Sequence, residues 1–312
     1  MRTKRVVVTG ATGMIAATLI DYLSQRGIEV FAICRPGSKK ISNIIVNEYI
    51  HIIECDIDDL LSLNAKIKVK CDIFFHFGWD GTFANARDDA ALQCRNIKDT
   101  LDAIELAYLL KCQKFIGAGS QAEYGITSSK LSSSITANPI TGYGIAKYAA
   151  GKLGLIRCKQ LNMKFNWARI LSVYGPYDNN HTLIMSTIIK MVNNERVKFT
   201  KGEQEWDYTF SKDIAKAFYL IAENGMDGKT YILGTGVTRK LKEYIEIIGK
   251  EILPNQLLKF GEVPYNENQV MHLCANIEEL ENDTGFVPEY TFETGICETI
   301  DWYKTRCENE KN

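Results

Sequence analysis

Hydrophobic positions in the first 175 residues fall into short continuous apolar runs, and longer amphipathic runs separate them. Short runs that are rich in β-branched and aromatic residues and end at turn residues are typical of buried strands. The predicted strands lie at 4–9, 29–34, 50–55, 72–76, 114–120 and 165–170. The predicted helices follow Gly13 and Ile57 and span 88–110 and 143–160. Strands that alternate with helices predict an α/β fold with a doubly wound parallel sheet, whose ligands bind beyond the carboxyl ends of the strands.

A glycine turn joins the first predicted strand to its helix, and it reads Gly10-Ala-Thr-Gly13-Met-Ile-Ala16. Gly10 permits the tight turn, Gly13 lets the backbone approach a pyrophosphate, and the helix N-terminus attracts the negative charge. Ala16 takes the place of the third glycine of the usual pattern and is still small enough for close helix–strand packing. In this strand–turn–helix context, the glycines predict a dinucleotide site on a Rossmann-type sheet.

The regular alternation stops after residue 175. The later pattern predicts a helix at 181–192, strands at 196–200 and 206–210, a helix at 214–223, and one more strand and short helices from residue 231 onward. A chain of 312 residues is long enough for about two domains. We therefore predict a Rossmann domain that binds NAD(P), from 1–175 plus about 206–224, and a smaller C-terminal α/β substrate-binding lobe from about 176–205 and 225–312.

The loop after the second strand bears on the choice between NADP and NAD. A site for NAD usually places an Asp or Glu near this strand end to hold the ribose 2′-hydroxyl, and none is present here. Arg35 and Ser38, with Lys39 and Lys40 beside them, could instead hold a 2′-phosphate. The loop therefore favours NADP, with NAD as the alternative, although a solvated basic loop accounts for the same residues equally well.

Tyr143 and Lys147 stand four residues apart in a run without helix breakers. On a helix, this spacing places the two side chains on one face, about 6 Å apart at Cβ. Because a nearby ammonium favours the ionised phenol, the tyrosine is a candidate acid/base group. Other candidates occupy the predicted strand ends, namely Gly10, Arg35, Asp56, Gly78 and Ser120. Core packing does not explain why these residues all fall at the ligand-binding edge of the sheet.

Composition limits the classes of function. The formal net charge is −1, so the chain lacks the electrostatic footprint of nucleic-acid binding. The nine cysteines contain no C-x-x-C pair and the four histidines show no metal-ligand spacing, so we expect a reduced, cytoplasmic protein without a metal site. No apolar run approaches the roughly 18 residues that cross a bilayer, so no membrane span is expected.

Six motifs occur in order along nearly the whole chain. They are Thr9-Gly-Ala-Thr-Gly-Met-Ile15, Asp56-Ile57, Asn96-Ile-Lys-Asp-Thr100, Ser120 four residues before Tyr124-Gly125, Tyr143-x-x-x-Lys147, and Arg169-x-x-x-Val-Tyr-Gly-Pro176. With these motifs, the sequence resembles the extended short-chain dehydrogenase/reductases, in the NAD-dependent nucleotide-sugar epimerase/dehydratase branch. The resemblance implies a hydride-transfer enzyme that uses NAD(P) and a nucleotide-sugar substrate. It also implies a homodimer that packs through helices 88–110 and 143–160.

The resemblance assigns roles by position. The tyrosine of the family is the acid/base on a sugar hydroxyl or ketone, the lysine holds the nicotinamide ribose, the serine bonds the reacting oxygen, and an asparagine supports a water relay. These catalytic residues correspond to Tyr143, Lys147, Ser120 and Asn96. The implied cofactor contacts are Gly10, Thr12, Gly13, Met14, Ile15, Arg35, Ser38, Asp56, Ile57, Phe77, Gly78, Trp79, Tyr143, Lys147 and Ile170. The implied substrate contacts are Ser120, Tyr143, Ser172, Phe199 and Trp206.

The sequence also departs from the family pattern. Dehydratases of this branch carry an Asp-Glu pair directly after the serine or threonine, and here those positions are Gln121-Ala122, so dehydration is not expected. The arginine of the family before Asp207 is Trp206, and its asparagine after the sixth strand is Ser172. Residues 261–290 contain no second arginine. These changes remove residues with which the family usually binds the substrate diphosphate.

The prediction that follows is an NAD(P)-dependent oxidoreductase that acts at C4 of a nucleotide-linked hexose. A 4-keto-sugar reductase that uses NADPH is favoured, because the acid after the second strand is missing. A 4-epimerase with bound NAD, like UDP-glucose 4-epimerase, is the alternative. Reduction of a non-nucleotide ketone or aldehyde stays open because the arginines are missing. A non-catalytic NADP-binding regulator is more remote, because a regulator has no need of Ser120, Tyr143 and Lys147.

Overall fold

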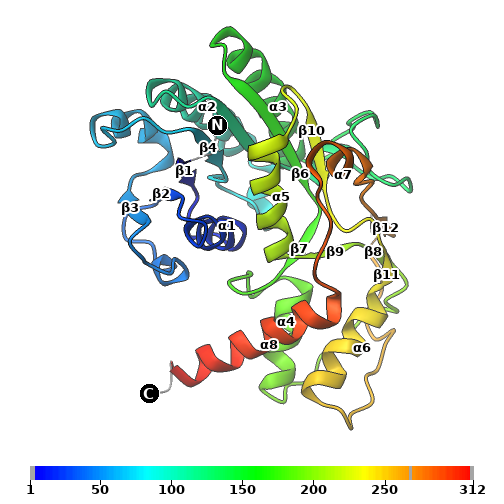
Figure 1. Ribbon diagram of the computed structural model, residues 1–312. Helices are drawn as coiled ribbons and strands as arrows, with labels where there is room; N and C mark the ends of the chain where they lie inside the picture. Colours follow the sequence, from blue (N-terminus) through cyan, green and yellow to red (C-terminus); the bar gives the residue numbers. More distant parts are fainter. Residues whose placement is uncertain (1–3, 267–268, 310–312) are drawn as a thin grey trace.

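A seven-stranded parallel sheet forms the centre of the molecule and confirms the predicted fold class (Figure 1). The computed structural model describes residues 4–266 and 269–309. The strand order is β10-β6-β5-β4-β1-β2-β3, and every neighbouring pair is parallel. The bounds are β1 Arg5–Thr9, β2 Glu29–Cys34, β3 Ile50–Glu54, β4 Ile73–His76, β5 Lys114–Ser120, β6 Lys164–Ile170 and β10 Thr230–Leu233. The order reverses between β1 and β4, and ligands of such sheets bind at this switch point.

Alternate side chains of the central strands enter two separate cores. In β1, Val6 and Val8 lie in one core with residues of α1 (Met14–Ser24) and α5 (Ser211–Asn224). Val7 lies in the other core with residues of α2 (Ala90–Leu109) and α3 (Gly142–Gln160). The division follows from the two-residue period of a strand, which sends successive side chains to opposite faces. Burial of each such side chain contributes about 1.5–3 kcal/mol.

A third core lies beside the sheet and includes Tyr174, Ile188, Phe210, Tyr244 and Phe292. Three helices contribute to it, and they lie together at the bottom of Figure 1: α4 (Leu183–Val192), α6 (Leu241–Ile252) and α8 (Phe292–Asn309). We call these helices, with the two short sheets, the smaller lobe. The short sheets are β7 (Ser172–Tyr174) with β9 (Tyr208–Phe210), and β11 (Arg239–Lys240) with β8 (Glu205–Trp206) and β12 (His272–Leu273). The remaining α-helix, α7 (Glu278–Thr284), packs against α5.

Two predicted elements of the second half differ from the structure. Residues 196–200 form no strand, because the carbonyls of Phe199 and Thr200 accept hydrogen bonds from a turn at 261–263 and no second strand pairs with them. The predicted strand at 206–210 is two strands in different sheets, divided at Asp207. The strand β10 also lies in the main sheet beside β6, although the range 225–312 was assigned to the smaller lobe.

Asp207 accounts for the break between β8 and β9. Its side chain is fully buried, and its carboxylate accepts hydrogen bonds from the backbone N–H groups of Thr235, Gly236 and Ala275. Three backbone donors compensate the loss of hydration, which is the condition for burying a carboxylate. The residue thus joins the end of β10 to the segment after β12, and the chain changes sheets around it.

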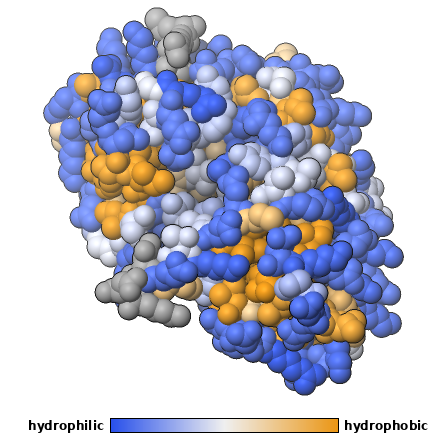
Figure 2. All heavy atoms as spheres, turned by 60° about the horizontal axis from the view of Figure 1, so that its bottom comes forward, coloured by the Kyte–Doolittle hydropathy of each residue, from blue (hydrophilic) through white to orange (hydrophobic). Residues whose placement is uncertain are grey.

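The surface carries apolar side chains as well as polar ones. Figure 2 shows apolar side chains gathered in the lower half of the view and in a second area at the upper left, with polar side chains around both. Within residues 4–266 and 269–309, no helix combines the length and the apolar character needed to cross a membrane.

Candidate active site

The carboxyl ends of the central strands surround one large cavity, with a volume of about 1130 Å³. Residues from the smaller-lobe side, among them Val173, Asp178 and Tyr208, line the same cavity. It therefore lies at the switch point of the sheet and extends to the second part of the molecule. Most of the predicted site residues line it, namely Gly10, Thr12, Gly13, Met14, Ile15, Arg35, Ser38, Asp56, Ile57, Phe77, Gly78, Trp79, Ser120, Tyr143, Lys147, Ile170 and Ser172.

The turn between β1 and α1 is shaped by two glycines. Gly10 has φ +65°, and an added Cβ would lie 2.8 Å from the backbone nitrogen of Gly78, so no other residue fits without strain. A Cβ on Gly13 would meet only the carbonyl oxygen of Gly10, at 3.4 Å, so Gly13 leaves space open. Among the residues that the structure describes, no side chain caps the start of α1. The free N–H groups of the first turn are therefore available to an anion.

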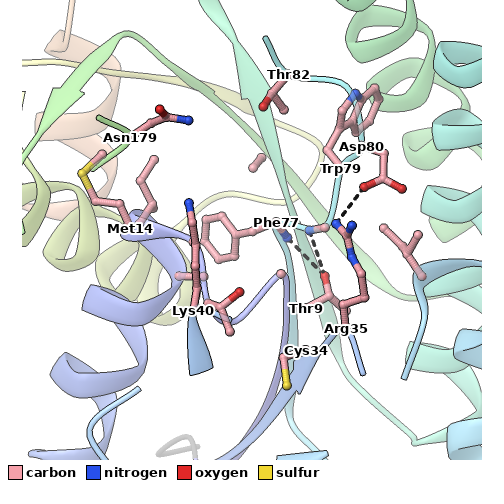
Figure 3. Close-up of a pocket in the computed structure, with 18 of the residues that line it drawn as sticks. Thr9, Met14, Cys34, Arg35, Lys40, Phe77, Trp79, Asp80, Thr82 and Asn179 are labelled. Carbon is pink, nitrogen blue, oxygen red and sulfur yellow. Dashed lines mark hydrogen bonds and ion pairs between the residues drawn. The ribbon is translucent and has the colours of Figure 1, made fainter. Parts of the chain in front are cut away.

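Thr9 fastens the end of β4 to β1. Its Oγ1 accepts the backbone N–H groups of Phe77 and Gly78, each at 3.2 Å, and lies 2.9 Å from Nδ1 of His76 (Figure 3). Burial, and then the charge of Lys147, lower the pKa of His76 to about 3. His76 is therefore neutral at physiological pH, and its role is structural, as a hydrogen-bond partner of Thr9.

Asn96 does not line the cavity and instead supports the loop after β4. Its side-chain oxygen accepts the N–H of Asp80, and its amide nitrogen donates to the carbonyl of Asp80, both at 2.9 Å. The side chain is buried, so these two bonds fix the loop that carries Trp79 and Asp80. A role in a water relay to Lys147 stays a prediction.

Arg35 extends to Asp80, which comes from the end of a different strand (Figure 3). The guanidinium nitrogen and the carboxylate oxygen are 3.0 Å apart, and the two side chains are 70% and 38% exposed. A carboxylate therefore lies beside Arg35 even though no acid follows β2 in the sequence. The sequence analysis missed Asp80 because it lies 45 residues further along the chain.

Tyr143 lies on α3 with two polar side chains, Ser120 and Arg87, beside it. Burial raises the pKa of Tyr143, while a side-chain hydrogen bond with Ser120 and the positive charge of Arg87 lower it. The guanidinium carbon of Arg87 lies 4.3 Å from the centre of the Tyr143 ring. Arg87 also lines the cavity, although in the sequence it is only a lone arginine in a polar stretch. It is a cation beside the candidate acid/base group that sequence reasoning did not find.

The ammonium of Lys147 makes its nearest contacts with the backbone and with Trp79 rather than with the ring of Tyr143. Its ammonium donates to the carbonyl of Ala118 at 2.8 Å and lies 3.7 Å from the centre of the Trp79 ring, but 5.8 Å from the centre of the Tyr143 ring. Burial lowers the pKa of Lys147 to about 7. The lysine is therefore only partly charged at neutral pH, whereas Arg87 is charged throughout.

A buried ion pair fixes the backbone at Ser120. Glu123 accepts the N–H of Ser120 at 2.9 Å, the indole N–H of Trp167 at 2.9 Å, and the guanidinium Nε–H of Arg169 at 2.7 Å. Glu123 is fully buried and Arg169 is nearly so. The arginine of the motif that begins at residue 169 thus acts through Glu123 on the position of the serine.

Two predicted substrate contacts lie elsewhere. Phe199 is 4% exposed and packs in the third core against Phe260, so its side chain is not available to a ligand. Trp206 does not line the cavity. Its indole N–H donates to the hydroxyl of Ser172 at 2.7 Å, and Ser172 does line the cavity. The two positions that depart from the family pattern are therefore in direct contact.

Comparison with known proteins agrees with this geometry. The model of the NAD dependent epimerase/dehydratase family matches residues 6–234, which is more than half of the chain. The chain belongs to this family.

Within the NAD dependent epimerase/dehydratase family, the chain is similar to proteins of several activities. It is 25% identical over 308 residues to the CDP-abequose synthase of Salmonella typhimurium, covering 95% of this chain and 97% of the relative. The structure of UDP-N-acetylglucosamine 4-epimerase from Methanobrevibacter ruminantium M1, in complex with UDP-N-acetylmuramic acid, superposes with a TM-score of 0.88 at 25% identity, covering 98% and 100% of the two chains. The structure of dTDP-glucose 4,6-dehydratase from Bacillus anthracis, in complex with NAD, gives a TM-score of 0.84 at 19% identity, covering 98% of each chain.

The residues at the strand ends fit the dinucleotide that the family name implies. The open space at Gly13 and the uncapped start of α1 suit a pyrophosphate, as in other sheets of this type. An added Cβ on Gly78 would lie 2.6 Å from the side chain of Ile57, so the backbone after β4 closely approaches the residue that follows β3 by three positions. These observations support a cofactor at the β1–β4 switch point. The similar proteins catalyse different reactions, so family membership alone does not specify the reaction of this chain.

Proposed function

We propose that the protein is an NAD(P)-dependent oxidoreductase that acts at C4 of a nucleotide-linked hexose, and that it reduces a 4-keto group with Tyr143 as the acid. The observation that carries the proposal is the position of Tyr143 in the cavity, with Ser120 lining the same cavity and the guanidinium carbon of Arg87 4.3 Å from the centre of its ring. A phenol in such surroundings can deliver a proton to a carbonyl oxygen that receives a hydride. The bound nicotinamide supplies that hydride.

The other residues have supporting roles in this proposal. Ser120 orients the carbonyl oxygen toward the phenol, and Glu123 holds the backbone of Ser120 in place. Lys147 binds the nicotinamide ribose from the side of Trp79. Arg87 favours the ionised phenol that remains after the proton has left Tyr143.

Dehydration is disfavoured by the residues beside Ser120. A dehydratase needs a further acid and base there, and Gln121 and Ala122 supply neither. The nearest acid along the chain, Glu123, already accepts three hydrogen bonds in a buried ion pair with Arg169. A carboxylate held in this way is not free to exchange protons with a substrate.

A 4-epimerase with retained NAD is the second candidate. Similarity to a UDP-N-acetylglucosamine 4-epimerase supports it, as does the NAD bound by a structural neighbour. Arg35, Ser38 and Lys39 line the cavity and favour NADP(H), and with it the reductase, but Asp80 competes for Arg35. A non-nucleotide ketone or aldehyde and a purely regulatory role are more remote, because the cavity extends past Tyr143 to the smaller lobe and its proton-transfer residues are intact.

The test is to follow both reactions with the purified enzyme. CDP- and dTDP-linked 4-keto-6-deoxyhexoses are offered with NADPH deuterated at the transferring position, and UDP-glucose and UDP-N-acetylglucosamine are offered without added cofactor. The proposal expects oxidation of one NADPH per sugar and deuterium at C4 of the product. Interconversion of the UDP-sugars at the 4-hydroxyl without net use of cofactor would replace the proposal by the epimerase. No turnover in either assay, with NADPH bound, would favour the regulator.

A further inference from the structure

A buried carboxyl group at the cofactor end of the cavity has no role in the proposed function. Asp99 lies in α2, is 2% exposed, and lines the cavity. Its Oδ1 has no hydrogen-bond partner in the part of the chain that the structure describes. An unpaired buried polar group costs about 1–3 kcal/mol, and a charged one costs more. A protein that keeps such a group beside a binding cavity gains from it when a ligand supplies the missing partner.

The surroundings of Asp99 are those of a site for a flat, mostly apolar ring. The 3₁₀ helix η2 (Ile57–Ala65) packs against α2, and Ile57 and Leu60 present apolar side chains to the cavity. Residues from the ends of β2 and β3 complete this end, namely Ile33, Cys34, Cys55 and Asp56. Asp56 is exposed at the rim, whereas Asp99 is buried.

The charges around Asp99 leave its carboxyl group unpaired. Arg95 lines the same cavity, and Lys98 pairs with Asp102, but neither cation lies within ion-pair distance of Asp99 among the described residues. Burial raises the pKa of Asp99 to about 6, with Asp102 and Asp58 adding to the rise and Lys98 and Arg95 opposing it. The group therefore exists near neutral pH both as a carboxylate, which accepts, and as a carboxylic acid, which also donates.

We propose that Asp99 binds the edge of the cofactor's adenine, with Oδ1 accepting a hydrogen bond from the 6-amino group. The inference rests on the proposed function, because it takes the cavity to hold NAD(P). The amino group offers two hydrogens, so Asp99 from the floor and Asp56 from the rim do not compete for the same one. A protonated Asp99 matches adenine further, because its hydroxyl donates to ring N1. Hypoxanthine reverses this pattern, with an acceptor at position 6 and a donor at position 1.

The test compares NAD with nicotinamide hypoxanthine dinucleotide, which differs only at that base edge. Calorimetric titration of the purified protein should give a dissociation constant for NAD at least about tenfold lower, since an unpaired buried group costs about 1–3 kcal/mol and 1.4 kcal/mol is tenfold. Asp99→Ala should bring the two affinities within about threefold of each other, and Asp99→Asn should also narrow the difference, because its amide can donate to the oxygen of hypoxanthine as well as accept from the amino group of adenine. Glu105→Gln is the matched control, because Glu105 lies on the same helix, does not line the cavity and is not among the charges that shift the pKa of Asp99.

Thermal unfolding without cofactor separates binding from a structural role. Removing a buried carboxyl group that has no partner should leave the melting temperature of Asp99→Ala unchanged or higher. A marked loss of stability in Asp99→Ala would overturn the inference, as would equal affinities for the two dinucleotides in the wild-type protein or a preference that survives in Asp99→Ala. If NAD binds and only the preference fails, this inference alone is wrong. If neither NAD nor NADPH binds at all, the proposed function fails with it.

Discussion

We expect cofactor preference to depend on a competition for Arg35 between the carboxylate of Asp80 and the 2′-phosphate of NADPH. We expect NADPH to bind about tenfold more tightly than NADH. Arg35→Ala should remove most of the difference, and Asp80→Asn should enlarge it. The reason is that the guanidinium lies 3.0 Å from the carboxylate of Asp80, so a 2′-phosphate must take Arg35 from a partner that it already has.

The magnitude follows from the exposure of the two groups. A charged hydrogen bond from Arg35 to a phosphate contributes about 1.5–3 kcal/mol. The existing ion pair is 70% and 38% exposed, and pairs of this kind contribute only about 0.2–1 kcal/mol. The phosphate therefore wins by about 0.5–2.8 kcal/mol, which centres near tenfold in affinity. Asp80→Asn removes the competitor and a like charge, so it should strengthen NADPH binding by a further factor of about 3 to 5.

Calorimetric titration of NADPH and NADH at one fixed ionic strength is the assay, because salt screens exposed charges. Arg26→Ala is the control, since it removes an arginine that stacks on Tyr22 outside the cavity. In the double variant Arg35→Ala with Asp80→Asn, the gain from Asp80→Asn should largely disappear if Asp80 acts through Arg35. Equal wild-type affinities, or an unchanged preference in Arg35→Ala, would refute the reasoning. An NAD that survives purification would make 4-epimerisation the better interpretation.

The remaining predictions concern the acid/base group and assembly. Tyr143→Phe should lower kcat by about 10² or more while cofactor affinity stays nearly unchanged, and a variant with more than a tenth of the wild-type rate would mean that another residue is the acid. Arg87→Met should raise the pKa of Tyr143, read from phenolate absorbance against a Tyr143→Phe blank, and Arg87→Lys should lower it again; an unmoved titration contradicts the role of Arg87. The pKa of Lys147 lies below its unfolded value, so the folded state binds fewer protons than the unfolded state. The free energy of unfolding should therefore rise between pH 7 and 8.5, by about 1.5 kcal/mol more in the wild type than in Lys147→Met. Parallel curves for the two proteins would contradict this. We also predict a dimer through the exposed apolar face of α3, which includes Leu153 and Ile156. The double variant Leu153→Glu with Ile156→Glu should therefore be monomeric in light scattering. A wild-type protein that is monomeric at micromolar concentration would refute the interface.

The regular half of the fold followed from the sequence because its signals are local. The bounds of β2 and β5 match the predicted strands, since a continuous apolar run between turn residues has one stable outcome in a parallel sheet. The second half was harder because its short strands depend on distant partners. Asp207 reads as part of a strand until the three backbone amides that bind it, more than 25 residues away, are known.

The candidate site divides in the same way. The glycine turn and the Tyr143–Lys147 pair are set by spacing along the chain, and the structure places these residues around one cavity. Asp80 and Arg87 escaped notice because nothing in their sequence neighbourhood marks them. Asp99 stands inside the motif at 96–100, but only Asn96 of that motif was given a role, and the importance of Asp99 comes from its place at the cavity. The resemblance implied Phe199 as a substrate contact. Its side chain lies instead in the third core, and its backbone is bonded to the turn at 261–263, a partner that is distant in the sequence.

The hydrogen bond between Trp206 and Ser172 has an evolutionary consequence. Each residue stands where the related sequences have a different polar group, and each satisfies the other. Replacing Trp206 by arginine alone, or Ser172 by asparagine alone, would remove this hydrogen bond and place a different polar group against the unchanged residue. The two positions are therefore coupled, and we expect them to change together rather than singly. Relatives that share both residues are the ones expected to share its substrate.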